Sequence, residues 1–132
     1  MSDGSCRALV LEDDRAIAGL LKAVLIREGF AVEVVSKARD AIECIGLDRY
    51  DLIVLDLMVP DHGQQVIEYI KQHHLDALRS VIVVTAAPDA IRSALRGEYP
   101  EAICKFVAKP FDVPEFVELV HACKKLCVAD RP

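Results

Sequence analysis

The sequence predicts an α/β fold, in which a doubly wound five-stranded parallel sheet carries helices on both of its faces. Five short apolar runs alternate with longer stretches whose apolar residues recur every three or four positions, as amphipathic helices require. Three of the runs are apolar throughout, which is typical of strands buried on both faces of a parallel sheet. The 132 residues, 53% of them hydrophobic, suffice for one core, so we expect a single domain over residues 1–132. Its core is expected from about residue 7 to residue 126, between two short polar tails.

The first predicted strand covers Arg7–Leu11, and a helix follows over about Arg15–Glu28. Asp13 or Asp14 can cap the start of this helix, and Gly29 suits a left-handed residue at its end. The spacing of its apolar residues predicts the side that faces the core, made of Ile17, Leu20, Leu21, Val24 and Leu25.

Phe30–Val35 predicts the second strand, and Ser36 the cap of a second helix that ends at Gly46. The third strand is the run Leu52–Leu55, which leads directly into Asp56. The residues expected to face the core from the second helix are Ala38, Ala41, Ile42 and Ile45.

A loop with Pro60 and Gly63 leads into a third helix, and a fourth strand covers Val81–Thr85. A weaker helix around Ile91 and Leu95 precedes the fifth strand. That strand covers Ile103–Ala108, and the last helix opens on the D-x-x-E capping box Asp112–Glu115. The residues expected to face the core are Val66, Ile67 and Ile70 in the third helix and Phe116, Leu119, Val120, Cys123 and Leu126 in the last.

Charges within the strands predict which strands lie at the sheet edges. Glu33 in the second strand and Lys105 in the fifth tolerate exposure, so these two strands belong outside. The resulting order, 2-1-3-4-5, is that of flavodoxin-like folds, in which ligands bind at the carboxyl ends of the first and third strands.

Composition excludes several classes of function. A net charge of −5 argues against binding to nucleic acid or to anionic membranes. No run of about 20 apolar residues is present, so we expect a cytoplasmic protein. The five cysteines form no C-x-x-C pair and are predicted to be free, buried thiols. Cys123 and Cys127, four residues apart, are a much weaker candidate for metal binding.

Polar residues end four of the predicted strands. Glu12 and Asp13 follow the first strand, Asp56 follows the third, Thr85 ends the fourth and Lys109 follows the fifth. Because parallel strands end at the same edge of a sheet, we expect these side chains to gather around one crevice.

Crowded carboxylates repel one another and are relieved by a divalent cation, and oxygen ligands alone suit Mg²⁺. A carboxylate beside such an ion can attack phosphorus, with Lys109 and Thr85 binding the phosphoryl oxygens. The simpler alternative is that the acidic residues only charge the start of the first helix, a role that suits Asp14. That alternative leaves the pair Asp13 and Asp56 unexplained.

Four motifs together carry a family resemblance: Leu-Glu-Asp-Asp, Leu-Asp-Leu-Met-Val-Pro, Val-Thr-Ala and Ala-Lys-Pro-Phe. In this order and spacing they look like the receiver domain of bacterial two-component response regulators, over about Arg7 to Leu126. The resemblance implies a signalling role rather than an enzyme with a separate substrate. Asp56 would accept a phosphoryl group from a histidine kinase or a phosphotransfer protein.

The same resemblance implies roles for the other site residues. Asp13 and Asp56 would bind Mg²⁺, or Mn²⁺ in its place, directly, with Glu12 acting through water and Met58 through its backbone carbonyl. Thr85 would be a switch residue together with the aromatic Phe106. A downstream effector, or a second copy, would bind the face made by the fourth helix, the fifth strand and the fifth helix.

The sequence departs from the family pattern after Pro60, where the loop is one residue shorter and His62 is a candidate, though a weak one, for a contact at the crevice. His73 and His74 suit the end of the third helix better than a metal site. The Met1 start and short tail favour a stand-alone receiver over a fragment of a longer regulator.

Other functions fit the sequence less well. A haloacid dehalogenase-type phosphohydrolase needs a second aspartate where Met58 stands, and a nucleotide-binding module needs a glycine-rich first turn. A dimerisation-only protein leaves the acidic crevice unexplained. A receiver that binds partners without being phosphorylated stays the alternative, although it would typically lack Asp13, Asp56 or Lys109.

Overall fold

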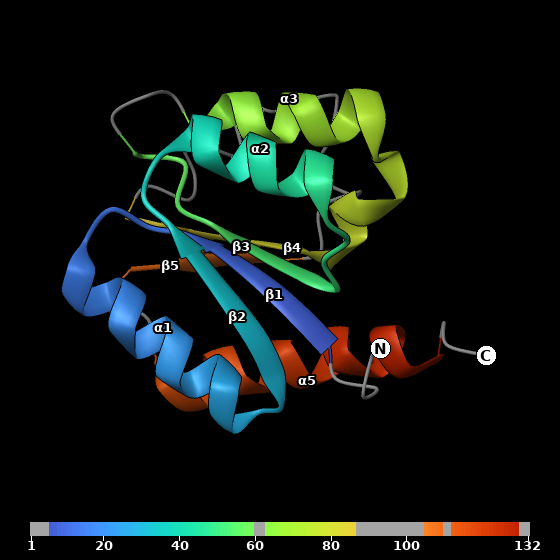
Figure 1. The fold of residues 1–132 in the computed structure, drawn as a ribbon. Coiled ribbons are helices and arrows are strands. Elements are labelled where there is room, and N and C mark those ends of the chain that lie inside the picture. The colour runs from blue at the N-terminus through green and yellow to red at the C-terminus, as the bar shows by residue number, and fades with distance from the viewer. Residues whose placement is uncertain (1–5, 60–62, 87–104, 110–111, 130–132) are drawn as a thin grey trace.

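The computed structural model describes residues 6–59, 63–86, 105–109 and 112–129, and its centre is a five-stranded sheet (Figure 1). The strand order is β2-β1-β3-β4-β5, and each neighbouring pair runs parallel, which confirms the predicted fold. Exposed Glu33 lies on one edge strand and Lys105 on the other, as predicted. The strands are β1 (Cys6–Leu11), β2 (Phe30–Val35), β3 (Leu52–Leu55), β4 (Val81–Thr85) and β5 (Lys105–Ala108).

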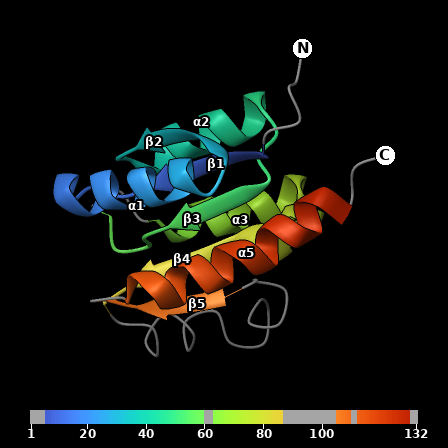
Figure 2. The ribbon, with the colours of Figure 1, turned by 90° about the horizontal axis from the view of Figure 1, so that it is seen from below.

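Helices cover both faces of the sheet. In Figure 1, α2 and α3 lie on one face and α1 and α5 on the other, and Figure 2 shows α1 and α5 side by side across the strands. A short 3-10 segment, η1, was not predicted; it links α3 to β4. The bounds are α1 (Arg15–Arg27), α2 (Ala38–Leu47), α3 (Gln64–His73), η1 (Leu75–Ser80) and α5 (Val113–Ala129).

Two hydrophobic cores flank the sheet, because successive strand residues point to opposite faces. The core under α2 and α3 takes one set of strand residues and the core under α1 and α5 takes the other. Strand residues are Leu9, Leu11, Ile53, Leu55, Val81 and Val83 in the first core, and Ala8, Val10, Leu52, Val54, Ile82 and Val84 in the second. This double burial explains why the central strands are apolar throughout.

Sequence signals for helix ends are confirmed for α1 and α5. The Asp14 carboxylate accepts a hydrogen bond from the Ile17 amide at 3.0 Å, and Gly29 follows the helix with a φ of 97°. At α5, the Asp112 carboxylate accepts a hydrogen bond from the Glu115 amide at 3.2 Å.

The predicted ends of α2 are wrong. Lys37, not Ser36, precedes the helix, and α2 continues through Gly46 to Leu47. A Cβ at Gly46 would lie 2.9 Å from the Tyr69 hydroxyl of α3, so this glycine serves the packing of α2 against α3. The helix begins after Lys37 because the Lys37 carbonyl oxygen accepts the first helical hydrogen bonds, from the amides of Asp40 and Ala41, each at 3.1 Å.

Two further expectations are corrected. Leu20 is 44% exposed, because α1 turns Ala18, Leu21, Val24 and Leu25 inward instead. Cys44 and Cys123 form no disulfide, as predicted, but Cys44 is half-buried and only Cys123 is buried; Cys6 is disulfide-bonded, to a partner beyond the side chains described. The helix predicted around Ile91 and Leu95, the start of the fifth strand and His62 lie outside the described residues.

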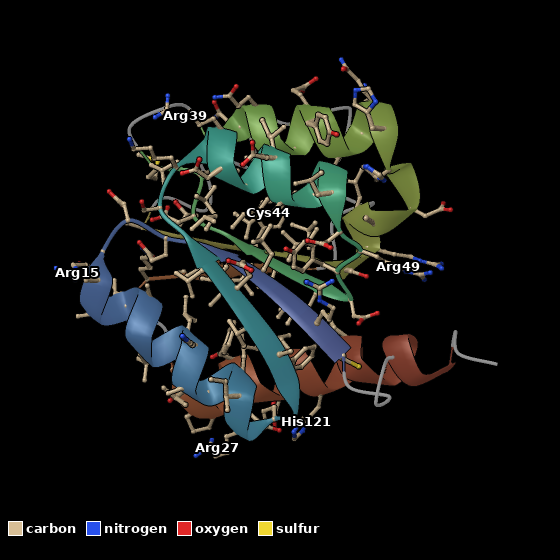
Figure 3. The ribbon with its side chains drawn as sticks, viewed as in Figure 1. Arg15, Arg27, Arg39, Cys44, Arg49 and His121 are labelled. Atoms are coloured by element: carbon tan, nitrogen blue, oxygen red, sulfur yellow. The ribbon has the colours of Figure 1, made fainter. Side chains whose placement is uncertain are left out.

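A polar side-chain contact joins the two helices on one face. His121 of α5 pairs with the Glu28 carboxylate, which follows α1, and Arg27 contacts the same carboxylate at 3.6 Å. Figure 3 shows Arg27 and His121 close together on this side of the molecule. Within the part of the chain described, no helix is both long and apolar enough to cross a bilayer.

Candidate functional site

Three predicted site residues each follow directly after a strand, and a main-chain hydrogen bond to the adjacent strand fixes each of them. These bonds run from Glu12 to Val35, from Asp56 to Leu11 and from Lys109 to Thr85, with N···O distances of 3.1, 3.0 and 2.9 Å. The sheet ladder therefore extends one residue past the strands and sets the positions of these Cα atoms.

Burial singles out the same edge of the sheet. Among the described residues, the buried polar or charged ones are Glu12, Asp56 and Thr85, which as whole residues are 2%, 4% and 0% exposed. Burying an ionised carboxylate costs several kcal/mol, on the order of the whole stability of a small domain, unless charges and hydrogen bonds compensate for it. Two buried carboxylates side by side are therefore expected only where a function requires them.

Lys109 binds both buried carboxylates. Its ammonium lies 2.8 Å from Glu12 Oε1 and 2.9 Å from Asp56 Oδ2, and only 16% of its side chain is exposed. One positive charge is thus shared by two negative charges, and the group keeps a net charge of −1. The negative charge of the Glu12 and Asp56 carboxylates is therefore only partly neutralised, although both side chains are buried.

Backbone amides hold the remaining carboxylate oxygens. The Met58 amide donates to Asp56 Oδ1 at 2.9 Å, and the Asp14 amide donates to Glu12 Oε2 at 3.2 Å. Each carboxylate is therefore held at one oxygen by the main chain and at the other by Lys109. Such two-point binding fixes the plane of each carboxylate.

The acidic side chains also form a candidate metal site. Glu12, Asp13 and Asp56 each offer a carboxylate oxygen, and these atoms lie within 4.8 Å of one another; the described residues contain no other such group. Asp13 is exposed and opens the cluster to solvent. A set of oxygen donors with one solvent-facing side fits Mg²⁺, which retains several waters when bound. Met58 is 58% exposed, and the contact it makes with the cluster is through its main-chain amide, which donates to Asp56 Oδ1.

The electrostatics follow from this crowding. Burial raises the pKa of Glu12, Asp56 raises it further, and hydrogen bonds from Lys109 and the Asp14 amide only partly offset these effects. Burial acts to lower the pKa of Lys109, but the carboxylates of Glu12 and Asp56 outweigh it, so the pKa is raised overall. The carboxylates thus retain Lys109 in its charged form, while Glu12 takes up a proton more readily than an ordinary glutamate.

Thr85 ends β4, and Phe106 lies on the neighbouring strand β5, three residues before Lys109. Thr85 is fully buried and pairs in register with Ala108, next to Lys109. Phe106 is half-buried and packs against the core under α2 and α3. The two predicted switch residues, Thr85 and Phe106, therefore lie on neighbouring strands, and Phe106 is two residues before the residue that pairs with Thr85.

The shared role of Lys109 was not predicted, because sequence analysis assigned it only to phosphoryl oxygens. The sequence does contain a pattern that indicates this role. Glu12 follows an apolar strand just as Asp56 does, which predicts that both carboxylates are buried near Lys109. His73 ends α3 and His74 follows it, both against the Tyr69 ring, in agreement with the expected position at the helix end.

Residues 8–121 match the response regulator receiver domain family. The chain belongs to this family. Among its relatives, the DNA-binding response regulator MtrA of Mycobacterium tuberculosis (strain ATCC 25618 / H37Rv) is 32% identical over 116 residues, 88% of this chain and 49% of MtrA. The receiver therefore spans about half the length of the curated relatives it matches.

Solved structures agree with the family assignment. Response regulator protein TrrA from Thermotoga maritima, in complex with Mg²⁺-BeF, is 30% identical to the receiver, with a TM-score of 0.76; the match covers 89% of this chain and 98% of TrrA. A structure of histidine kinase ThkA in complex with TrrA contains a chain that is 28% identical, with a TM-score of 0.73, over 89% of the receiver and 97% of that chain.

Proposed function

We propose that this receiver domain accepts a phosphoryl group on Asp56 from a histidine kinase or a phosphotransfer protein. The observation that carries the proposal is the shared lysine: two buried carboxylates, Glu12 and Asp56, bind one ammonium and keep an uncompensated negative charge. The complex of ThkA with TrrA supports a histidine kinase as the partner class. We extend the proposal to one receiver domain over residues 1–132.

In the transfer, an Asp56 carboxylate oxygen attacks phosphorus and the bond from phosphorus to the donor imidazole nitrogen breaks. The imidazole keeps that electron pair and, because its other ring nitrogen carries a proton, leaves as a neutral group, while the carboxylate becomes an acyl phosphate. Lys109, freed from Asp56 Oδ2, is close enough to bind a phosphoryl oxygen, and the Met58 amide keeps the other carboxylate oxygen oriented. The chain thus promotes only its own phosphorylation and dephosphorylation.

Glu12, Asp13 and Asp56 would hold Mg²⁺, or Mn²⁺ as a substitute, together with the Met58 carbonyl. When bound, the ion would neutralise negative charge on the carboxylates and on the incoming phosphoryl group. The Mg²⁺-BeF complex of TrrA and the oxygen-only donor set support this assignment.

Phosphorylation would then change the conformation around Thr85 and Phe106. A dianionic group on Asp56 should draw the Thr85 hydroxyl towards it, and Phe106 can occupy the vacated space without a buried hydrogen-bond partner. The face around β5 and α5 would in this way become the output surface for an effector or a second copy. Amide exchange with and without a beryllofluoride mimic should differ at Thr85 and Phe106; identical exchange maps would argue against the switch.

The alternative, a receiver that only binds partners, is disfavoured because Asp13, Asp56 and Lys109 are all present and gathered in one cluster. A mass measurement separates the two functions. With Mg²⁺ and acetyl phosphate, the wild type should gain one phosphoryl group, and Asp56→Asn should gain none. Asp51→Asn, which changes a carboxylate at the amino end of the central strand β3, is the matched control and should be labelled normally. Labelling that persists in Asp56→Asn would refute the assignment.

A further inference from the structure

Gly63 lies immediately before α3, and its Cα faces the main chain of Leu57, the residue after Asp56. A Cβ at Gly63 would lie 2.7 Å from the Leu57 Cα and 2.9 Å from both the carbonyl carbon and the oxygen of Leu57. The backbone of Gly63, with φ −55° and ψ −25°, is one that any residue can adopt. Space, not backbone conformation, therefore requires glycine here.

Neither side of this contact is free to move away. Leu57 and Val59 are each 4% exposed and belong to the core under α2 and α3. On the other side, α3 is anchored in the same core by Val66, Ile67 and Ile70, which are fully buried. The atoms that a side chain at position 63 would meet are main-chain atoms, so no side-chain rotation relieves the clash.

The segment held in this way supplies the main-chain groups next to Asp56. Met58 lies between the two anchored residues, and its amide donates to Asp56 Oδ1 at 2.9 Å. A shift of Leu57 would move this amide and the Met58 carbonyl relative to the carboxylate.

We propose that Gly63 is a positioning residue: its lack of a side chain lets α3 seat the Leu57–Val59 segment so that the Met58 main chain is correctly placed against Asp56. The consequence for metal binding rests on the function proposed above, whereas the placement of the Met58 amide does not.

The direct test compares three glycine variants of the full chain. In Gly63→Ala, hydrogen exchange of the Met58 amide in metal-free protein should accelerate about tenfold, since its bond to Asp56 lengthens. Mg²⁺ affinity should fall by about tenfold, as is typical when a group supporting a metal ligand is lost. Gly46→Ala would crowd only the end of the Tyr69 side chain, and Gly19→Ala has nothing within 4 Å, so neither should change these two quantities.

A second pair of variants tests the positioning role of Gly63 if Gly63→Ala does not fold. Val59→Ala removes core packing from the residue next to Met58, whereas Val81→Ala makes the same substitution in the same core at the start of β4. Val59→Ala should accelerate Met58 exchange and weaken Mg²⁺ binding, and Val81→Ala should do neither at a similar loss of stability.

Equal behaviour within either pair, Gly63→Ala with Gly46→Ala or Val59→Ala with Val81→Ala, would overturn the inference. A wild type that takes up no phosphoryl group would overturn the proposed function instead, and Met58 exchange would still decide the role of Gly63.

Discussion

The two ends of the parallel sheet both combine carboxylates with one basic side chain, yet they differ in burial. At the amino end, Arg7 lies 3.5 Å from the Asp48 carboxylate, and these side chains are 43% and 48% exposed. At the carboxyl end, Lys109 binds Glu12 and Asp56, whose side chains are only 1% and 6% exposed. Figure 3 places Arg49, at the amino end, and Arg15, at the start of α1, on opposite sides of the molecule.

The two ends differ in how far their negative charges are compensated by positive charge and solvent exposure. At the amino end the Asp51 carboxylate accepts a hydrogen bond from the Arg7 amide at 2.8 Å, the Arg7 guanidinium lies 5.1 Å from the centre of the Tyr50 ring, and the Arg7–Asp48 ion pair is about half exposed. Exposed pairs of this kind contribute about 0–1 kcal/mol to stability. At the carboxyl end the Glu12 and Asp56 carboxylates are buried and share one ammonium, so the site retains affinity for a further positive charge. Burial, not residue type, separates a structural ion pair from a reactive one.

The largest expected difference between the two ends is in the free energy of unfolding. Without Mg²⁺, Lys109→Met should lower it by about 3 kcal/mol, because two buried carboxylates lose their counter-charge. Arg7→Met, the matched change at the amino end, should lower it by less than about 1 kcal/mol. Urea unfolding of both variants measures this, and equal losses would contradict the comparison.

Added Mg²⁺ should stabilise the carboxyl end alone. At a free concentration about 100 times its dissociation constant, the ion should raise the free energy of unfolding by about 2.7 kcal/mol. Asp13→Asn removes a charged ligand and should shrink this gain, whereas Asp48→Asn should leave it intact. Thermal melts across a Mg²⁺ titration provide the measurement; a similar gain in all three proteins would exclude the acidic cluster as the binding site.

The raised pKa of Glu12 predicts a smaller effect of pH. A pKa that is higher in the folded than in the unfolded protein gives stability that is lost as pH rises, from the ordinary glutamate value of 4.5 through the raised one. Metal-free protein should therefore lose stability over this range, and Mg²⁺ should bind more weakly as Glu12 becomes protonated. Glu12→Gln should flatten both profiles, and Asp48→Asn should not; a Glu12→Gln protein with the wild-type profiles would disprove this cause.

The smallest effect concerns the lifetime of the phosphorylated form. Met58, two residues after Asp56, cannot orient a water for hydrolysis, and Ala87, two residues after Thr85 and outside the described residues, has no polar group either. Met58→Asn and Ala87→Glu should each speed the loss of the phosphoryl group by about threefold, because a polar side chain can position the water that hydrolyses the acyl phosphate. Leu47→Asn, a polar change at another exposed apolar residue, on α2 and outside the site, should not. Decay followed by mass spectrometry tests this, with His62→Ala included; a strongly prolonged lifetime in that variant would assign the base to His62.

The sequence predicted the strand order and the gathering of the acidic residues because both follow from the geometry of parallel sheets. Glu33 and Lys105 marked the edge strands, and strand ends collect at one edge whatever the side chains are. These features depend on pattern and topology, so no knowledge of distances was needed.

Features set by contacts between distant elements could not be predicted in the same way. Ser36 and Gly46 carry ordinary signals for helix ends, yet Tyr69, from another helix, determines what Gly46 does. The disulfide of Cys6 depends on a spatial neighbour that composition does not name. In the sequence Gly63 is an ordinary loop glycine; only the fold brings its Cα against the main chain of Leu57, six residues earlier.

The main-chain hydrogen bonds that extend the sheet past its strands have an evolutionary consequence. The amides of Glu12, Asp56 and Lys109 are held by carbonyl groups, which every residue possesses, so this registration does not depend on which apolar side chains the strands carry. Such an arrangement tolerates extensive divergence of sequence while the reactive atoms stay registered, in keeping with a TM-score of 0.76 to a protein only 30% identical. It also means that volume-conserving exchanges among the apolar strand residues of β1, β3 and β4 should leave the Cα positions of Glu12, Asp56 and Lys109 unchanged, as long as both cores stay filled.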